Sequence, residues 1–353
     1  MALRVRRQAR NAAGSRGAGG IGAAVELSAM HLLLVPSTVH PEDVCDLVRA
    51  RVPASDLSAT GQTALGRHSA LSGPYKLSME DAVDAAVPMP WTVVYALSAP
   101  IEREDPPIPG TDDRDGFTHA FPHGLPWREE GRTLQLLVAL ARRVEGAVRI
   151  AGSSGLLQPD PQQAVDMIIH SPYWLDPEVL LGVVQRVVPT AQLEIEGADW
   201  NGPSDAAYSG AAISPYLSNA PISPYDLSHL HHIADQNDMA VMASDHVIDG
   251  FAVAGDIGPY GEDGALEVLV HVGRDREPAV IGQPWADQPF VTYEVRWAPT
   301  DWEERERRIP SQSFLTSRQR VQPLVRALTR MIVEATGGVV TDEDGFWLDR
   351  YGL

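Results

Sequence analysis

Two stretches of the sequence are nearly the same segment written twice. HPEDVCDLVRARVP (His40 to Pro53) aligns without gaps on DPEVLLGVVQRVVP (Asp176 to Pro189), and five of the fourteen positions are identical. Each copy follows an apolar run, HLLLV at 31–35 and DMIIH at 166–170. Self-similarity of this kind constrains the architecture more than any short motif, because each copy has to form a similar packed unit.

Both copies predict a strand, a short loop and a helix. Asp176 is a good N-cap and His40 a weaker one, and proline follows each at the first helical position, where its missing N–H costs nothing. In the first copy the apolar residues recur at i, i+3, i+4 and i+8, which places them on one helix face. These residues are Val44, Leu47, Val48 and Val52. A proline ends each copy.

Three further echoes occur in the same order along the chain. They are PYKLS at 74–78 with PYDLS at 224–228, WTVVYALSAP at 91–100 with FVTYEVRWAP at 290–299, and ALARRVEGAVRIAGSSGLL from Ala139 with ALTRMIVEATGGVVTDEDGFWL from Ala327. Because the segments mix strands and helices without strict βαβ alternation, the predicted class is α+β. We predict an internal duplication, a tandem repeat of two similar α+β units at 31–160 and 161–353. Two such units are expected to pack about a pseudo-twofold axis.

Two regions do not fit the repeat. Residues 1–29 carry five arginines and one acidic residue. An Arg-rich transit peptide is one interpretation, but a disordered extension, or a start codon assigned too early with Met30 as the true start, is favoured. The second unit is longer by an insertion at about 191–288. It contains two predicted strands, VIDGFAVAG and ALEVLVHVG, joined by the hairpin connection DIGPYGEDG.

Composition excludes several classes of function. A net charge of −19 argues against a nucleic-acid partner, since phosphate binding needs a basic face. No apolar run approaches 18 residues, so no membrane span is expected. The single cysteine, Cys45, allows no intrachain disulfide, and its place on the apolar helix face predicts a small core residue. A cytoplasmic protein is predicted. One lysine against 27 arginines indicates the codon bias of a high-GC bacterium.

The segment DLSHLHHIADQND (226–238) is the best candidate for a metal site. On a helix, residues three or four apart share a face, so His229 groups with His232 and His231 with Asp235. Zinc takes three or four N, S or O ligands, usually from more than one element, and His246 is a possible further contributor. The alternative is a solvated or partly packed helix, which the echo of PYKLS in PYDLS favours.

The same segment superficially resembles the HxHxDH motif of metallo-β-lactamase-type hydrolases. Ile233 stands where that motif has aspartate, and Ala234 where it has the last histidine. These departures put a hydrolase site of that family in doubt.

Two functions from different classes follow. The favoured one is a non-catalytic binding or interaction module with no cofactor, which binds a protein or a small molecule at the seam between the two units. The alternative is a metal-dependent hydrolase-like enzyme that uses the cluster from His229 to His232 and a divalent metal. Whether the protein is an enzyme stays open, and no catalytic residue is assigned.

Overall fold

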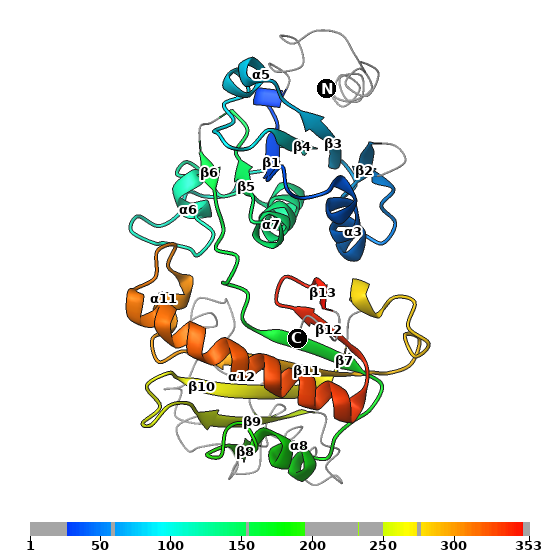
Figure 1. Cartoon of the computed structure of the whole chain (residues 1–353), viewed down its shortest axis with the longest axis vertical. Helices are drawn as coiled ribbons and strands as arrows, with labels where there is room; N and C mark the ends of the chain where they lie inside the picture. Colours follow the sequence, from blue (N-terminus) through cyan, green and yellow to red (C-terminus); the bar gives the residue numbers. More distant parts are fainter. Residues whose placement is uncertain are drawn as a thin grey trace.

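The computed structural model describes residues 27–57, 61–152, 155–194, 232, 250–273 and 277–348. The chain forms two antiparallel sheets, each covered by helices, and the predicted α+β class is confirmed (Figure 1). None of the described helices is both long and apolar enough to cross a bilayer.

The first unit is built on a six-stranded sheet in the order β2-β3-β4-β1-β5-β6. Its elements are β1 (His31–Val35), α3 (Pro41–Arg51), β2 (Gln62–Ala64), β3 (Ala70–Lys76), α5 (Met79–Asp84), β4 (Val93–Ser98), α6 (Phe117–Ala120), α7 (Arg128–Arg143), β5 (Ala147–Arg149) and β6 (Leu156–Leu157). The predicted helix after the first apolar run is α3, which begins at Pro41 as expected.

The central strand β1 explains why this sheet is covered on both faces. All five of its residues are buried. Successive side chains of a strand point to opposite faces. Leu33 and Val35 pack against α3 and α7, whereas Leu32 and Leu34 pack on the other face against α5 and Trp91. A continuous apolar run is typical of a strand enclosed in this way.

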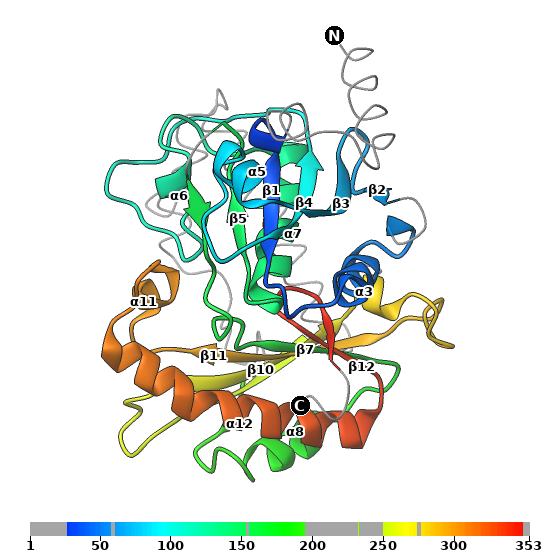
Figure 2. The same ribbon diagram turned by 45° about the horizontal axis from the view of Figure 1, so that its top comes forward.

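The second unit is built on a seven-stranded sheet in the order β13-β12-β7-β11-β10-β9-β8. Its elements are β7 (Met167–Ser171), α8 (Pro177–Val184), β8 (Gln192–Glu194), β9 (Gly250–Asp256), β10 (Ala265–Val272), η1 (Pro278–Val280), β11 (Val291–Ala298), α11 (Trp302–Glu306), α12 (Gln312–Thr336), β12 (Val339–Asp342) and β13 (Trp347–Leu348). Helices α8 and α12 cover one face, on the side away from the first unit (Figure 2). The predicted hairpin is confirmed as β9 and β10.

The first packed unit begins before Met30. The Arg149 side chain is almost fully buried, and it donates hydrogen bonds to the carbonyl oxygens of Leu27 (2.6 Å) and Ser28 (2.9 Å). Burial lowers the pKa of this guanidinium to about 10. A buried cation needs such acceptors, so residues 27 and 28 belong to the fold of the first unit.

A buried tyrosine occupies the same register position in each sheet. Leu33 on β1 pairs with Tyr95, and Ile169 on β7 pairs with Tyr293. The Tyr293 hydroxyl donates to the Tyr173 carbonyl (2.8 Å) and accepts from the Leu175 amide (2.8 Å), which fixes the loop between β7 and α8. The buried Tyr95 hydroxyl has no hydrogen-bond partner among the described residues.

Removing each of the two hydroxyls should therefore have a different effect on the free energy of unfolding. Tyr293→Phe removes two part-buried hydrogen bonds, to the Tyr173 carbonyl and from the Leu175 amide, and is expected to lower the free energy of unfolding by about 0.5–1.5 kcal/mol. Tyr95→Phe removes a hydroxyl without a partner and should be neutral or slightly stabilising. Urea unfolding monitored by circular dichroism measures both, and an equal loss in the two variants would contradict this expectation.

Candidate functional site

The predicted histidine site lies almost entirely outside the described residues. This applies to His229, His231, Asp235 and His246, whereas His232 is an exposed helical residue. Within the described ranges, no group of three or more His, Cys, Asp or Glu side chains is placed to hold a metal ion. The metal hypothesis thus stays a prediction.

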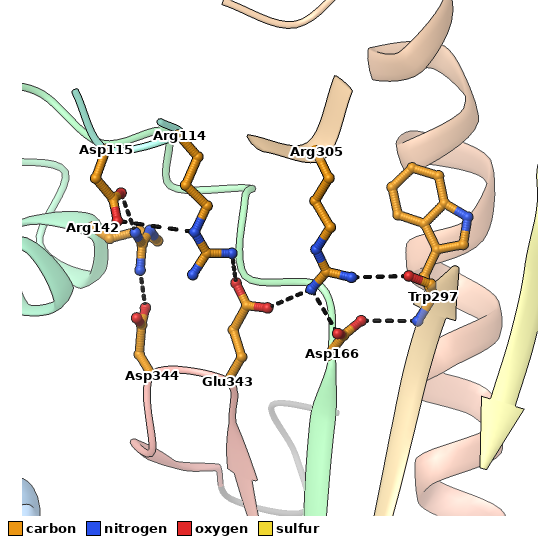
Figure 3. Close-up of polar contacts among 8 residues, drawn as sticks. All are labelled: Arg114, Asp115, Arg142, Asp166, Trp297, Arg305, Glu343 and Asp344. Carbon is orange, nitrogen blue, oxygen red and sulfur yellow. Dashed lines mark hydrogen bonds and ion pairs between the residues drawn. The ribbon is translucent and has the colours of Figure 1, made fainter. Parts of the chain in front are cut away.

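Ion pairs join the two units at the seam where a ligand was predicted (Figure 3). Arg142 on α7 of the first unit is the most buried of these cations. It binds Asp344, in the β12–β13 hairpin of the second unit, and Asp115 (2.6 Å). The hairpin predicted after the helix from Ala327 therefore has two contacts: it belongs to the second sheet, and it also binds the first unit.

A second group of ion pairs continues the seam towards α11. The Arg305 guanidinium lies 2.6 Å from Asp166 and 2.9 Å from Glu343, and it donates to the Trp297 carbonyl (2.9 Å). Arg114 binds the other oxygen of Glu343 (2.8 Å). Burial raises the pKa of the Glu343 carboxyl, and the two guanidiniums oppose that rise. Arg305 thereby joins the seam to the strand β11.

Phe346 makes a further contact between the two units. This residue belongs to the β12–β13 hairpin, yet its ring is fully buried in the core of the first unit. The guanidinium carbons of Arg51 and Arg143 lie 5.9 and 5.7 Å from the ring centroid. Apolar burial and cation–π contacts together make this part of the seam a packed interface.

A pocket lies in the second unit, next to the residues that Arg305 contacts. It has a volume of about 290 Å³ and opens between the β9–β10 hairpin, the end of β11, α11 and the first turns of α12. Its lining residues are Glu262, Asp263, Trp297, Pro299, Thr300, Asp301, Glu304, Ser311, Ser313, Phe314 and Ser317. The pocket thus combines an apolar base with hydroxyl and carboxylate groups.

Hydrogen bonds hold the base and one wall of the pocket in place. The Trp297 and Phe314 rings pack with their centroids 5.0 Å apart. The Trp297 indole N–H donates to the Asp263 carbonyl (2.7 Å), and Arg320 binds the Asp263 carboxylate through Nε (2.9 Å). Burial alone would raise the pKa of Asp263, but hydrogen bonds from Arg320 and Ser317 lower it. The hairpin is therefore fixed against the base.

The chain's own carboxylates already satisfy the amino end of α12. Glu304 accepts a hydrogen bond from the Ser311 amide (2.6 Å), which lowers the pKa of this carboxyl. The positive end of a helix favours an anion, and Glu304 takes that position. Glu262 and Asp301 stay on the exposed rim. Four carboxylates thus line the pocket, of which Asp263 and Glu304 are paired with Arg320 and Arg307.

A smaller cavity of about 10 Å³ lies behind the same two rings. Trp297 and Phe314 form part of its wall, so the rings separate it from the large pocket. Two buried polar atoms in its lining, Gln163 Oε1 and Arg318 Nε, have no hydrogen-bond partner among the described residues. The cavity has room for about one water molecule. The inner end of the site thus holds an unsatisfied acceptor and an unsatisfied donor.

Two histidines are buried in the core of the sheets. His31 Nε2 lies 3.1 Å from Glu130 Oε1, and the Ala151 amide donates to Nδ1 (3.1 Å). His170 Nδ1 lies 3.4 Å from the Thr292 hydroxyl. Burial lowers the pKa of each histidine to about 4. Both are therefore neutral at pH 7.

These histidines predict how stability depends on pH. The unfolded chain binds protons at a pKa of about 6.5 and the native chain only near 4, so stability should fall as the pH drops from about 6.5 towards 4. In His170→Gln, the loss of unfolding free energy between about pH 7.5 and 5 should be smaller by about 2 kcal/mol. Urea titrations at both pH values measure it. The exposed-site control His123→Gln should match the wild type, and an unchanged loss in His170→Gln would contradict the prediction.

Sequence reasoning identified parts of the pocket but not the pocket itself. It predicted the glycine-rich hairpin connection DIGPYGEDG, which contributes Glu262 and Asp263 to the pocket. Nothing in the sequence indicated that Trp297 and Glu304 would join that connection in one pocket, because acidic residues are common throughout this chain. Comparison with protein-family models, curated proteins and solved structures finds no match for this chain.

Proposed function

We propose that the protein is a non-catalytic binding protein whose large pocket receives a basic side chain of a polypeptide. The observation that carries this proposal is the order of groups from the base to the rim. Trp297 and Phe314 offer an apolar surface, the serines of α12 offer hydroxyls, and Glu262 and Asp301 add negative charge at the opening. Arginine and lysine have the matching order, an apolar stem that ends in a cation.

Exposed aromatic residues beside the pocket favour a polypeptide over a free small molecule. Tyr260, in the hairpin turn two residues before Glu262, is 95% exposed, and Trp302, next to Asp301, is 69% exposed. Aromatic residues are enriched at protein interfaces and dominate their binding energy. A partner chain could cover both rings while one basic side chain enters the pocket.

Calorimetric titration with a capped tri-arginine peptide tests the proposal. The peptide should bind the wild type, and the double variant Glu262→Gln/Asp301→Asn should weaken binding by about tenfold or more, a change of about 1.4 kcal/mol. The matched control, Glu80→Gln/Asp84→Asn, removes the same charge from exposed positions on α5. Equal weakening in both variants would indicate only general attraction to an acidic protein, and no binding to the wild type would refute the proposal.

We also propose that the two units descend from a tandem duplication, with the pseudo-twofold relation kept as a prediction. The strand orders support it: β2-β3-β4-β1-β5-β6 matches β9-β10-β11-β7-β12-β13, with β8 as an added edge strand. Gly146 and Gly338 support it too, because a Cβ at either would collide with a carbonyl oxygen of the neighbouring strand, that of Leu34 or of His170. A common origin accounts for both shared features, the strand order and the close approach of a glycine to the neighbouring strand.

The strand orders also refine the sequence alignment. By their pairing with β1 and β7, Tyr95 corresponds to Tyr293. The alignment of WTVVYALSAP on FVTYEVRWAP instead makes Tyr95 correspond to Glu294. The strand orders match β9 and β10 with β2 and β3, which narrows the added segment from 191–288 to about 192–249. PYDLS lies outside the described residues and precedes β9. Because this scheme matches β3 with β10, PYDLS does not correspond to PYKLS, which lies at the end of β3.

The metal-dependent hydrolase remains the second candidate, supported only by the histidine density of 229–232. Metal analysis of protein purified without an affinity tag tests it. A stoichiometric metal that is lost in His231→Ala and His232→Ala would favour the enzyme.

A further inference from the structure

We propose that the pocket selects an arginine of its partner, and that this arginine enters by replacing Arg320 on the Asp263 carboxylate. The inference rests on the proposed function: it names the basic side chain and the residue that regulates its entry. In the free protein Arg320 occupies one of the pocket carboxylates. A partner therefore has to compete with a guanidinium of the chain itself.

The Asp263 carboxylate already binds a guanidinium in the fork arrangement. It lines the pocket, and its side chain is only 6% exposed. Arg320 Nε donates to both of its oxygens, Oδ2 at 2.9 Å and Oδ1 at 3.2 Å, and Nη2 also donates to Oδ1. Among cationic side chains only a guanidinium offers a planar fork of N–H groups to one carboxylate, whereas an ammonium acts as a point charge. This wall of the pocket is therefore suited to arginine more than to lysine.

The two partners of this ion pair differ in how firmly they are held. The Arg320 side chain is 53% exposed, and it also donates a long hydrogen bond to the Ser317 hydroxyl (3.4 Å). Water can take over its N–H groups when it leaves, so its displacement has a low cost. Asp263 is buried, and its carbonyl accepts from the Trp297 indole N–H (2.7 Å). The carboxylate thus stays in place while its cationic partner is exchanged.

Glu262 connects this exchange to the rim of the pocket. It precedes Asp263 in the hairpin and is exposed. The hydrogen bond to Asp263, together with the charges of Asp263 and Glu262, raises the pKa of the Arg320 guanidinium. Both carboxylates therefore attract the same cation. An incoming arginine that pairs with Glu262 first weakens the attraction that holds Arg320 in place.

Calorimetric titration of the full-length protein with capped tri-arginine and tri-lysine peptides tests the inference. Wild type should bind tri-arginine about tenfold more tightly than tri-lysine. Arg320→Gln removes the competing guanidinium and should tighten tri-arginine binding by about fivefold. In Arg320→Gln/Asp263→Asn this gain should be lost, because the shared carboxylate is neutral. Arg326→Gln, which removes the same charge from an exposed position on α12, should match wild type.

The Arg320 Nε–H group gives a direct readout of the displacement. Its ¹⁵N–¹H resonance is identified by its absence in Arg320→Lys, and saturation with tri-arginine should move it to the position of a solvated arginine side chain. Arg320→Lys also serves if the glutamine variant fails to fold, because it keeps the positive charge. Since lysine does not form the fork, this variant should bind tri-arginine more tightly than wild type and less tightly than Arg320→Gln.

Several outcomes overturn the inference. Unchanged tri-arginine affinity in both Arg320 variants, or an Nε–H resonance that stays in place when the peptide is bound, would show that Arg320 does not compete. A gain that persists after Asp263→Asn would arise from general charge. Equal affinity for the two peptides would remove the selection of arginine. If tri-arginine binding in these cases is still weakened by Glu262→Gln/Asp301→Asn, the proposed function stands and only this inference fails. If tri-arginine binds neither wild type nor Arg320→Gln, both fail.

Discussion

Replacing Phe346 with alanine is expected to lower the free energy of unfolding by about 3–5 kcal/mol. The ring is fully buried in the core of the first unit, although it is carried by a hairpin of the second sheet. Its loss leaves a cavity among Leu, Val and Phe side chains and removes the contacts with Arg51 and Arg143. The substitution thus weakens the first core and the contact between units together.

Urea unfolding followed by tryptophan fluorescence and by circular dichroism measures both effects. The two probes should report one shared transition in wild type and separated transitions in Phe346→Ala, because the units lose their coupling. Trp347→Ala is the matched control, since its neighbouring ring is 58% exposed and should cost less than about 1 kcal/mol. A single transition with a similar small loss in both variants would contradict the role given to Phe346.

Replacing Arg142 with leucine should have a comparable effect through charge. The Arg142 side chain is 2% exposed and pairs with Asp115 and Asp344, which are 18% and 11% exposed. Removing one partner of a buried ion pair leaves the other charge uncompensated, which costs about 3–5 kcal/mol. The loss should exceed that of Arg132→Leu, an exposed arginine on the same helix.

A triple variant separates the electrostatic contribution of Arg142 from its packing contribution. In Arg142→Leu/Asp115→Asn/Asp344→Asn the stranded carboxylates are neutral, so part of the lost stability should return. Thermal and urea unfolding of the three proteins measure the recovery. If the triple variant is no more stable than Arg142→Leu alone, the guanidinium acts through its packing and the ion pairs contribute little.

Local signals were sufficient for the elements that begin and end within one segment. Proline after His40 and after Asp176 placed the starts of α3 and α8, because an N-cap and the first helical turn involve neighbouring residues only. Glycines 258, 261 and 264 adopt positive φ in the connection of β9 and β10, as expected for a tight hairpin. The buried environment predicted for Cys45 is confirmed for the same reason of local periodicity.

The register of the sheets was beyond the sequence. The sequence alignment of β4 on β11 differs by one residue from the correspondence that the strand pairing gives. A shift of one residue moves every side chain to the other face of a sheet. Only the pairing with β1 and β7 shows that two tyrosines occupy one position. One of them is fully hydrogen-bonded and the other has no described partner.

The sequence alone determined the α+β class, the starts of α3 and α8, the β9–β10 hairpin and an acidic chain with a basic start. The tertiary structure decided where the units meet and where a ligand could enter. A ligand was predicted at the seam, which stays a prediction; in the described part of the chain Phe346 and ion pairs such as that of Arg142 with Asp344, 202 positions apart, join the two units there. The pocket is likewise formed by a hairpin, a strand end and two helices. Contacts of this kind depend on how distant segments pack, and periodicity within one segment carries no information about them.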